Sequence, residues 1–141
     1  METFNVQPGT ATPQEAEDRA FKEATTQSPA AMTRYLLETV GPRVTAASLG
    51  LSDARQLRRW STGEAEPRQV LIADRLRTLF RVVFEITAVF GAATAATFLR
   101  SSNPQLDDSA PLMVLRAGQE DDDAHEGQRR VIGAARAFLE G

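Results

Sequence analysis

The 141-residue chain contains no cysteine, a single histidine, one tryptophan and one tyrosine. The absence of cysteine excludes disulfides, thiolate metal sites and a cysteine nucleophile. Because His125 is the only histidine, a metal site with several histidines and a mechanism that uses a histidine pair are excluded too. Apolar runs are short: the densest, residues 78–96, still contains Arg81 and Glu85, so no transmembrane helix is predicted.

The net charge is −3, but the charged residues are unevenly distributed along the chain. Residues 1–41 carry a balance of −3, residues 42–81 of +4 and residues 82–141 of −4. A negative net charge argues against non-specific nucleic-acid binding, whereas a local basic segment attracts phosphates whatever the total charge. The first 18 residues lack the basic and apolar segments of a signal peptide, so we expect a cytoplasmic protein with no membrane partner.

Helix signals dominate the sequence, and strand signals are weak. No segment alternates strictly between apolar and polar residues, and alanine is frequent. We therefore predict an all-α protein, a small helical bundle in three parts. Residues 1–27 form an N-terminal extension that is either partly disordered or one loosely docked helix, residues 28–67 a helix-turn-helix domain, and residues 68–141 a second helical domain.

Local signals mark where the helices begin and end. Residues 12–15, Thr-Pro-Gln-Glu, have the spacing of a capping box and predict a helix to about residue 25. Ser28-Pro29 repeats the start signal, and Gly41-Pro42 supplies a stop. A helix over about 68–90 has an apolar face wide enough for a central core helix. That face contains Ile72, Leu76, Leu79, Phe80, Val83, Ile86, Val89 and Phe90.

Residues 44–60 have the spacing of a helix-turn-helix. Gly50 falls where the chain must turn sharply, and Ser52 is placed to cap a second helix over 53–61. Leu57 and Trp60 then face inward, and the opposite face carries groups that suit base edges and phosphates. The residues predicted to contact DNA are Arg43, Ser52, Arg55, Gln56, Arg58 and Arg59, with Arg68 as a further phosphate contact.

A structural interpretation of this segment remains open, because short helix pairs joined by glycine are common in all-α proteins and an arginine-rich face is often only solvated. The segments LGLS and LRRW, followed by Gly63 and Pro67, resemble the sequence pattern of Xre-like repressors, in which the recognition helix ends at a tryptophan. The resemblance implies operator DNA as a partner.

The chain is expected to change direction sharply at Pro104, in the C-terminal part. Pro104 cannot continue a helix predicted over 92–100, and Leu106 should fill the core from the loop that follows. Pro111 is placed to begin a short helix that ends near Gly118. A last helix is predicted over about 124–140.

These motifs, taken with Val89-Phe90-Gly91 and the ending Phe138-Leu139-Glu140-Gly141, are similar to the toxin-binding domain of Xre/MbcA/ParS-type antitoxins. The similarity covers about residues 70–141, downstream of the helix-turn-helix as in that family. The sequence departs from the family pattern at Asp107-Asp108, where glycines are common, and at Phe98, where tryptophan is common.

The resemblance implies an antitoxin of a type II toxin–antitoxin pair. Its partner would be a RES-domain toxin that consumes NAD, and the antitoxin's C-terminal region would occlude the NAD pocket. The residues expected to contact the toxin are Arg136, Phe138, Leu139, Glu140 and Gly141. The antitoxin is expected to repress its own promoter as a homodimer or within a hetero-oligomer with the toxin.

No enzyme, cofactor or metal site is predicted. His125 stands beside residues 121–123 and Glu126, but one histidine with adjacent carboxylates lacks an organised set of ligands. Asp107-Asp108 is interpreted as a turn rather than a catalytic pair. Two alternatives to the antitoxin stay open: a stand-alone helix-turn-helix regulator without a toxin, and a protein-binding module in which the helix-turn-helix is only a scaffold.

Overall fold

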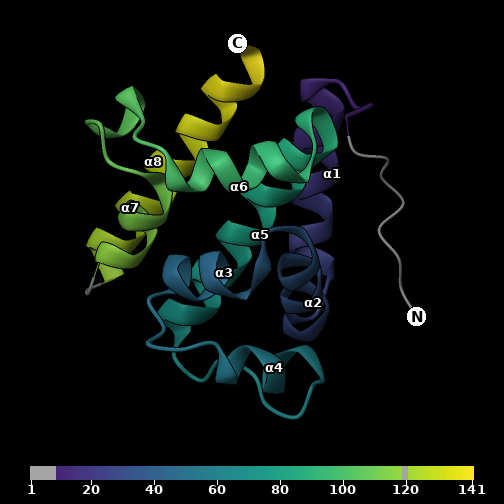
Figure 1. The fold of residues 1–141 in the computed structure, drawn as a ribbon, viewed down its shortest axis with the longest axis vertical. Coiled ribbons are helices and arrows are strands. Elements are labelled where there is room, and N and C mark those ends of the chain that lie inside the picture. The colour runs from purple at the N-terminus through teal and green to yellow at the C-terminus, as the bar shows by residue number, and fades with distance from the viewer. Residues whose placement is uncertain (1–8, 119–120) are drawn as a thin grey trace.

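The computed structural model describes residues 9–118 and 121–141, with no account of the side chains of 121–123. These residues form eight α-helices and one 3-10 turn, with no named strand, so the all-α prediction is confirmed (Figure 1). The elements are α1 (Pro13–Thr26), α2 (Pro29–Thr39), α3 (Gly41–Leu49), α4 (Arg55–Ser61), α5 (Val70–Phe90), α6 (Ala92–Arg100), η1 (Pro104–Leu106), α7 (Pro111–Ala117) and α8 (Asp121–Glu140). None of the described helices is both long and apolar enough to cross a membrane.

Helix α5 is the centre of the fold, as its wide apolar face predicted. Helices α1, α2, α6 and α8 all pack against it, with α1 and α2 on one side and α8 on the other (Figure 1). Phe80 and Phe84 are fully buried, and the Tyr35 ring of α2 lies 5.3 Å and 5.6 Å from their ring centroids. The helix ends at Gly91, whose φ of 96° is a conformation that favours glycine.

Helix α1 begins with the predicted capping box. The Glu15 N–H donates to Thr12 Oγ1 at 3.2 Å, and the Thr12 N–H donates to Glu15 Oε1 at 2.9 Å. Three alanines one turn apart, Ala16, Ala20 and Ala24, are buried against α5. The packing is therefore closer than the light docking that the sequence suggested, because small side chains let the two helix backbones approach.

The C-terminal part has the predicted turn after α6. Leu106 is buried after Pro104, and Asn103 and Ser109 form a single antiparallel bridge across the turn. Asp107 and Asp108 both have positive φ, 54° and 66°, the conformation for which glycine is the usual residue. One cluster of buried apolar side chains includes members from all three predicted parts of the chain, so these parts share a core.

Candidate nucleic-acid and protein interfaces

The connection from α3 to α4 turns at Gly50. This residue has a φ of 78°, and its N–H donates to the Ala47 carbonyl at 3.2 Å. The predicted cap by Ser52 is wrong: α4 begins at Arg55, and Asp53 Oδ1 accepts the Arg55 N–H at 2.8 Å. The Asp53 carboxylate, two residues before α4, therefore accepts the hydrogen bond from the first N–H of the helix, and Ser52 is exposed.

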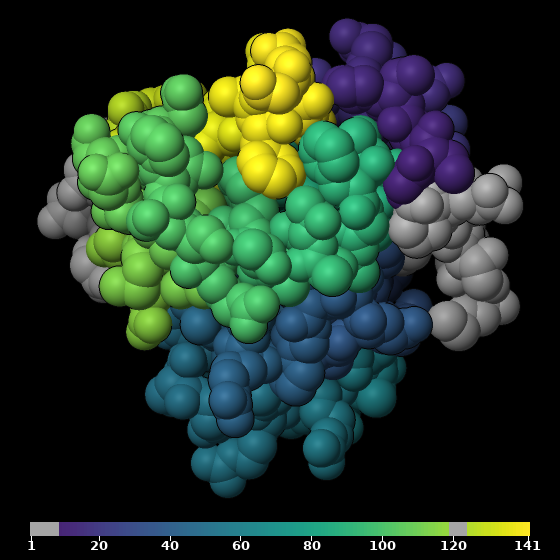
Figure 2. Space-filling view, turned by 45° about the horizontal axis from the view of Figure 1, so that its top comes forward, coloured from purple at the N-terminus to yellow at the C-terminus, as the bar shows by residue number. Residues whose placement is uncertain are grey.

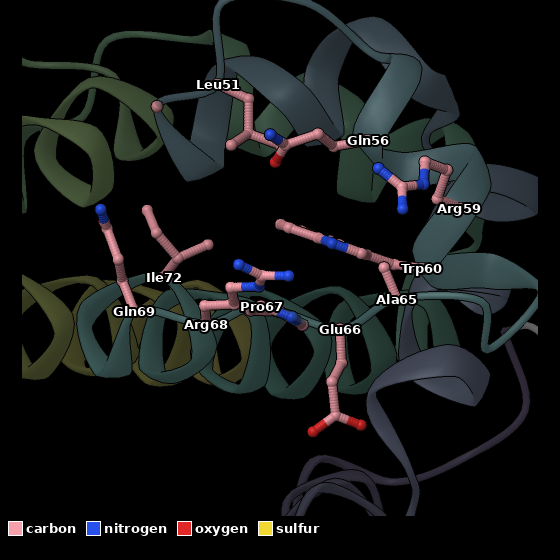
Figure 3. A pocket seen from close by; sticks show the side chains of 11 residues that line it. Leu51, Gln56, Arg59, Trp60, Ala65, Glu66, Pro67, Arg68, Gln69 and Ile72 are labelled. Atoms are coloured by element: carbon pink, nitrogen blue, oxygen red, sulfur yellow. The ribbon is translucent and has the colours of Figure 1, made fainter.

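One face of α4 is fixed to the rest of the molecule. Leu57 is fully buried and Trp60 is only 5% exposed. Arg34 of α2 donates to the Ser61 carbonyl at 2.7 Å, which anchors the C-terminal end of α4. The Trp60 ring lies between α4 and the loop that leads to α5 (Figure 3).

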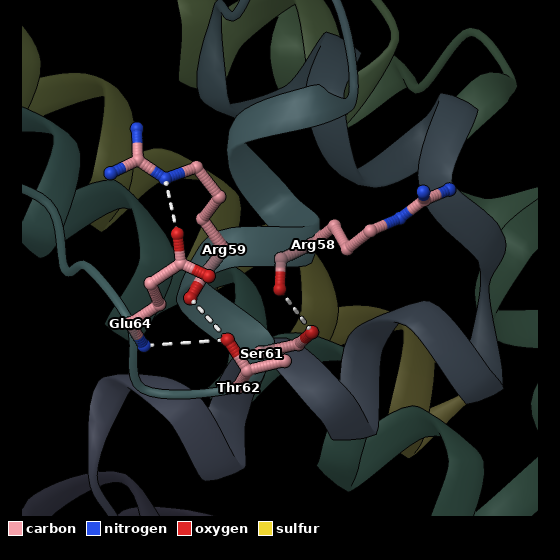
Figure 4. Close-up of polar contacts among 5 residues, drawn as sticks. All are labelled: Arg58, Arg59, Ser61, Thr62 and Glu64. Carbon is pink, nitrogen blue, oxygen red and sulfur yellow. Dashed lines mark hydrogen bonds and ion pairs between the residues drawn. The ribbon is translucent and has the colours of Figure 1, made fainter.

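The other face of α4 is basic and exposed. Arg55, Arg58 and Arg59 are all exposed, and the Arg58 and Arg59 side chains extend from the helix in different directions (Figure 4). Arg55 pairs with Asp53 at 3.2 Å and Arg59 with Glu64 at 3.3 Å. Hydrogen bonds from the side chain and the backbone N–H of Arg55 lower the pKa of Asp53. Exposed pairs of this kind contribute little to stability, so both guanidinium groups are available to a ligand.

Four of the six residues predicted to contact DNA line two hollows beside the α3–α4 turn, whereas Arg55 and Arg58 line neither of these. Arg43 and Ser52 line a hollow of about 510 Å³ together with Arg116 of α7. Gln56 and Arg59 line a separate cavity of about 560 Å³ together with Arg68. The set is therefore exposed as predicted, but it surrounds the α3–α4 turn rather than forming one flat strip.

The end of α8 is partly buried. Of the five residues predicted to contact a toxin, Leu139 is in the core, with an exposed fraction of 4%. Phe138 is 38% exposed, and Arg136 Nε donates to Glu17 Oε1 of α1 at 3.0 Å. Glu140 and Gly141 are exposed, and the last turn of α8, in yellow, lies at the surface (Figure 2).

Phe138 is part of an aromatic cluster that the sequence did not indicate. Its ring lies 5.4 Å from Phe90 and 5.2 Å from Phe98, measured between centroids. Phe90 was expected in the core stripe of α5, but it is 46% exposed. It is the last residue of α5 and therefore lies at the end of the apolar stripe. Helical spacing alone could not reveal this.

A buried carboxyl group, Glu85 of α5, was also missed. It is 1% exposed, and burial raises its pKa to about 7. Arg81 opposes this shift, Glu17 adds to it, and Arg136 again opposes it. Glu85 is therefore within electrostatic reach of the Arg136–Glu17 ion pair, which joins α8 to α1.

The acidic segment near His125 falls partly outside the described residues. His125 Nε2 lies 3.5 Å from Asp74 Oδ2. Among the side chains that the structure describes, no group of three or more histidines and carboxylates is arranged to hold a metal ion. The side chains of 121–123, which the sequence places near His125, lie outside those that the structure describes.

Comparisons of the chain with models of protein families, with curated proteins and with solved structures found no match.

Proposed function

We propose that this protein is the antitoxin of a type II toxin–antitoxin pair. In this proposal the end of α8 binds a RES-domain toxin and occludes its NAD pocket, while α4 and its surroundings bind operator DNA. The observation that carries the proposal is the separation of two exposed surfaces of different chemistry. The basic helix α4 lies at one end of the molecule and the end of α8 at the other (Figure 1).

The chemistry of α4 supports DNA as a partner. A guanidinium group donates two parallel hydrogen bonds to guanine in a major groove, and a glutamine amide does the same to adenine. Arg55 and Gln56 are exposed near the start of α4, while Leu57 and Trp60 hold the helix on the core. A local basic patch of this kind favours phosphates although the net charge is −3.

The chemistry of the α8 end supports a protein partner with a basic pocket. The buried Leu139 fixes the last turn, so the surface beyond it is shaped before binding. Phe138 and Phe90 offer an exposed aromatic pair, and aromatic side chains often dominate interface energies. The Glu140 carboxylate is exposed two residues further along the chain and suits an arginine of the partner.

DNA binding is tested with the upstream operator in a mobility-shift titration at one fixed salt concentration. The double variant Arg55→Ala with Arg59→Ala should lose about 2 kcal/mol or more, at least roughly thirtyfold in affinity, if both make base contacts. Arg129→Ala is the matched control, since Arg129 is an exposed arginine of α8 in an ion pair with Glu126. Unchanged affinity in the double variant would show that α4 does not read the operator.

Toxin binding is tested by co-expression with the toxin of the adjacent reading frame. Deletion of residues 136–141 should abolish neutralisation, but it also removes the buried Leu139. Phe138→Glu is therefore the sharper variant, and Met113→Glu is its control because Met113 is an apolar residue of α7 that is 52% exposed. Growth rescue by both the truncated protein and Phe138→Glu would exclude the α8 end as the toxin-binding surface.

A stand-alone regulator is the second candidate, and it is favoured by the α4 surface alone. Such a protein would bind its operator without a protein partner. A pull-down from the native cell separates the two: an antitoxin should co-purify with a RES-type protein, and a stand-alone regulator should not.

A further inference from the structure

The cavity of about 560 Å³ beside α4 has the features of a small-molecule site. It lies between α4, the loop over 62–69 and the first turn of α5 (Figure 3). Its volume is within the range of roughly 300–1,000 Å³ that is typical of ligand pockets. We refer to it as the α4–α5 cavity, after Leu51, Gln56, Arg59, Trp60, Arg68 and Ile72 of its lining.

The charged groups of the α4–α5 cavity favour an anion. The Arg68 side chain extends into the cavity, whereas the Glu66 carboxylate, from the same loop, points away from it (Figure 3). Arg68 has no ion pair or hydrogen bond with another residue that the structure describes. Arg59 is held by Glu64 through one contact at 3.3 Å, which leaves other guanidinium N–H groups free to donate.

Trp60 offers a further hydrogen-bond donor at the wall of the cavity. The residue is only 5% exposed, but its indole N–H, which has no hydrogen-bond partner among the described residues, is not one of the fully buried polar atoms. This N–H is therefore accessible and can donate to an acceptor. The Trp60 ring borders the cavity (Figure 3), so an acceptor bound there would satisfy the N–H.

We propose that the α4–α5 cavity binds a small organic anion, a carboxylate or phosphate on an apolar body. The anionic oxygens accept hydrogen bonds from the guanidinium groups of Arg68 and Arg59 and from the Trp60 N–H. The half-buried side chains of Leu51 and Ile72 contact the apolar body. The guanidinium groups that reach into the cavity are donors only, which favours an anion over a cation.

Binding at this cavity has a consequence that rests on the proposed function. Gln56 and Arg59 line the cavity and are also predicted DNA contacts. A bound anion would occupy these donors and lower the affinity for the operator, which makes the ligand an effector. Ligand binding itself needs no DNA, so its test is independent of the operator assay.

The experiment uses the single tryptophan of the full-length chain. Its indole N–H gives one signal in a 15N–1H correlation spectrum, which reports directly on the proposed donor. Benzoate, adenosine monophosphate and inorganic phosphate are titrated at constant ionic strength to about 10 mM, well above a millimolar dissociation constant. We expect a saturable shift of this signal with an organic anion, and the benzoate and nucleotide arms distinguish a carboxylate from a phosphate ligand.

Two arginine variants locate the site. Arg68→Gln should weaken binding at least tenfold, because it removes the unpaired cation. Arg58→Gln should leave binding unchanged, since Arg58 is an exposed arginine of α4 that does not line the cavity. The proposal is overturned if no probe gives a saturable shift, if inorganic phosphate binds as tightly as both organic anions, or if Arg68→Gln binds like the wild type. If the anion binds but the operator is not recognised, only the proposed function fails.

Discussion

Among single residues, Glu85 has the ionisation that should matter most for stability. Its pKa is about 7 in the folded protein against an ordinary value of 4.5, chiefly because it is buried. Between these two values the folded protein holds a proton that the unfolded chain has lost, so the free energy of unfolding decreases as pH rises. Above pH 7 the loss is complete, at about 3 kcal/mol, since each unit of pKa corresponds to roughly 1.4 kcal/mol.

Glu85→Gln should remove this pH dependence. A glutamine stays neutral, so the variant should be more stable than the wild type at pH 8, by up to about 3 kcal/mol, and similar to it at pH 5. Urea unfolding at both pH values measures the difference. An equal effect of the substitution at both pH values would show that Glu85 does not titrate in this window.

Two glycines should respond in opposite directions to alanine. Gly50 has a φ of 78°, and a Cβ there would lie 3.0 Å from Arg75 Nη1, so Gly50→Ala should destabilise the fold by about 1 kcal/mol or more. Gly133 is within α8 with no atom within 4 Å of an added Cβ, so Gly133→Ala should stabilise by roughly 0.5–1 kcal/mol. Thermal unfolding of both variants checks the signs, and a gain for Gly50→Ala would contradict the tight turn.

Residue types and spacing predicted which side chains occupy the surface of α4, but not which contacts they make. Ser52 and Asp53 are both good helix-start residues, and only the backbone path decides that Asp53 accepts the Arg55 N–H. The burial of Leu139 and the exposure of Phe90 depend on which other elements pack around each residue. Both exposures follow from tertiary packing, which the sequence near each residue does not specify.

At the scale of helices, Arg75 joins three elements. It lies on α5, is 4% exposed, and donates to the carbonyls of Leu49, Arg116 and Gly118, at the C-terminal ends of α3 and α7. Carbonyl groups at a helix end have no partner within the helix, and a cation there is favourable. Desolvation lowers the pKa of Arg75, and the charge of Arg116 lowers it further.

Arg75→Ala should therefore destabilise the protein by about 2 kcal/mol or more, since it leaves buried carbonyls without a donor. Arg129→Ala, which removes an exposed ion pair, should change stability little. Chemical unfolding of both variants gives the comparison. Equal stability of the two would mean that water replaces the Arg75 contacts at no cost.

Several helix boundaries were predictable from the sequence, although the start of α4 was not. Capping residues and glycines act on their own turn, so the starts at Thr12 and Ser28 and the ends at Gly50 and Gly91 follow from local sequence. How closely α1 docks was not predictable in the same way. Its alanines form a weak apolar signal, and their burial follows from the fit to α5.

At the scale of the whole molecule, α4 and the end of α8 lie at opposite ends of the fold (Figure 1). Substitutions that are distant and share no contacts usually have additive effects. Phe138→Glu should therefore abolish toxin binding and leave operator affinity unchanged, while Arg55→Ala with Arg59→Ala should do the reverse. Mobility shifts without toxin and toxin pull-downs without DNA measure the two effects separately. If either variant lost both activities while keeping its thermal stability, the two surfaces could not be independent, and a single shared interface would have to replace them.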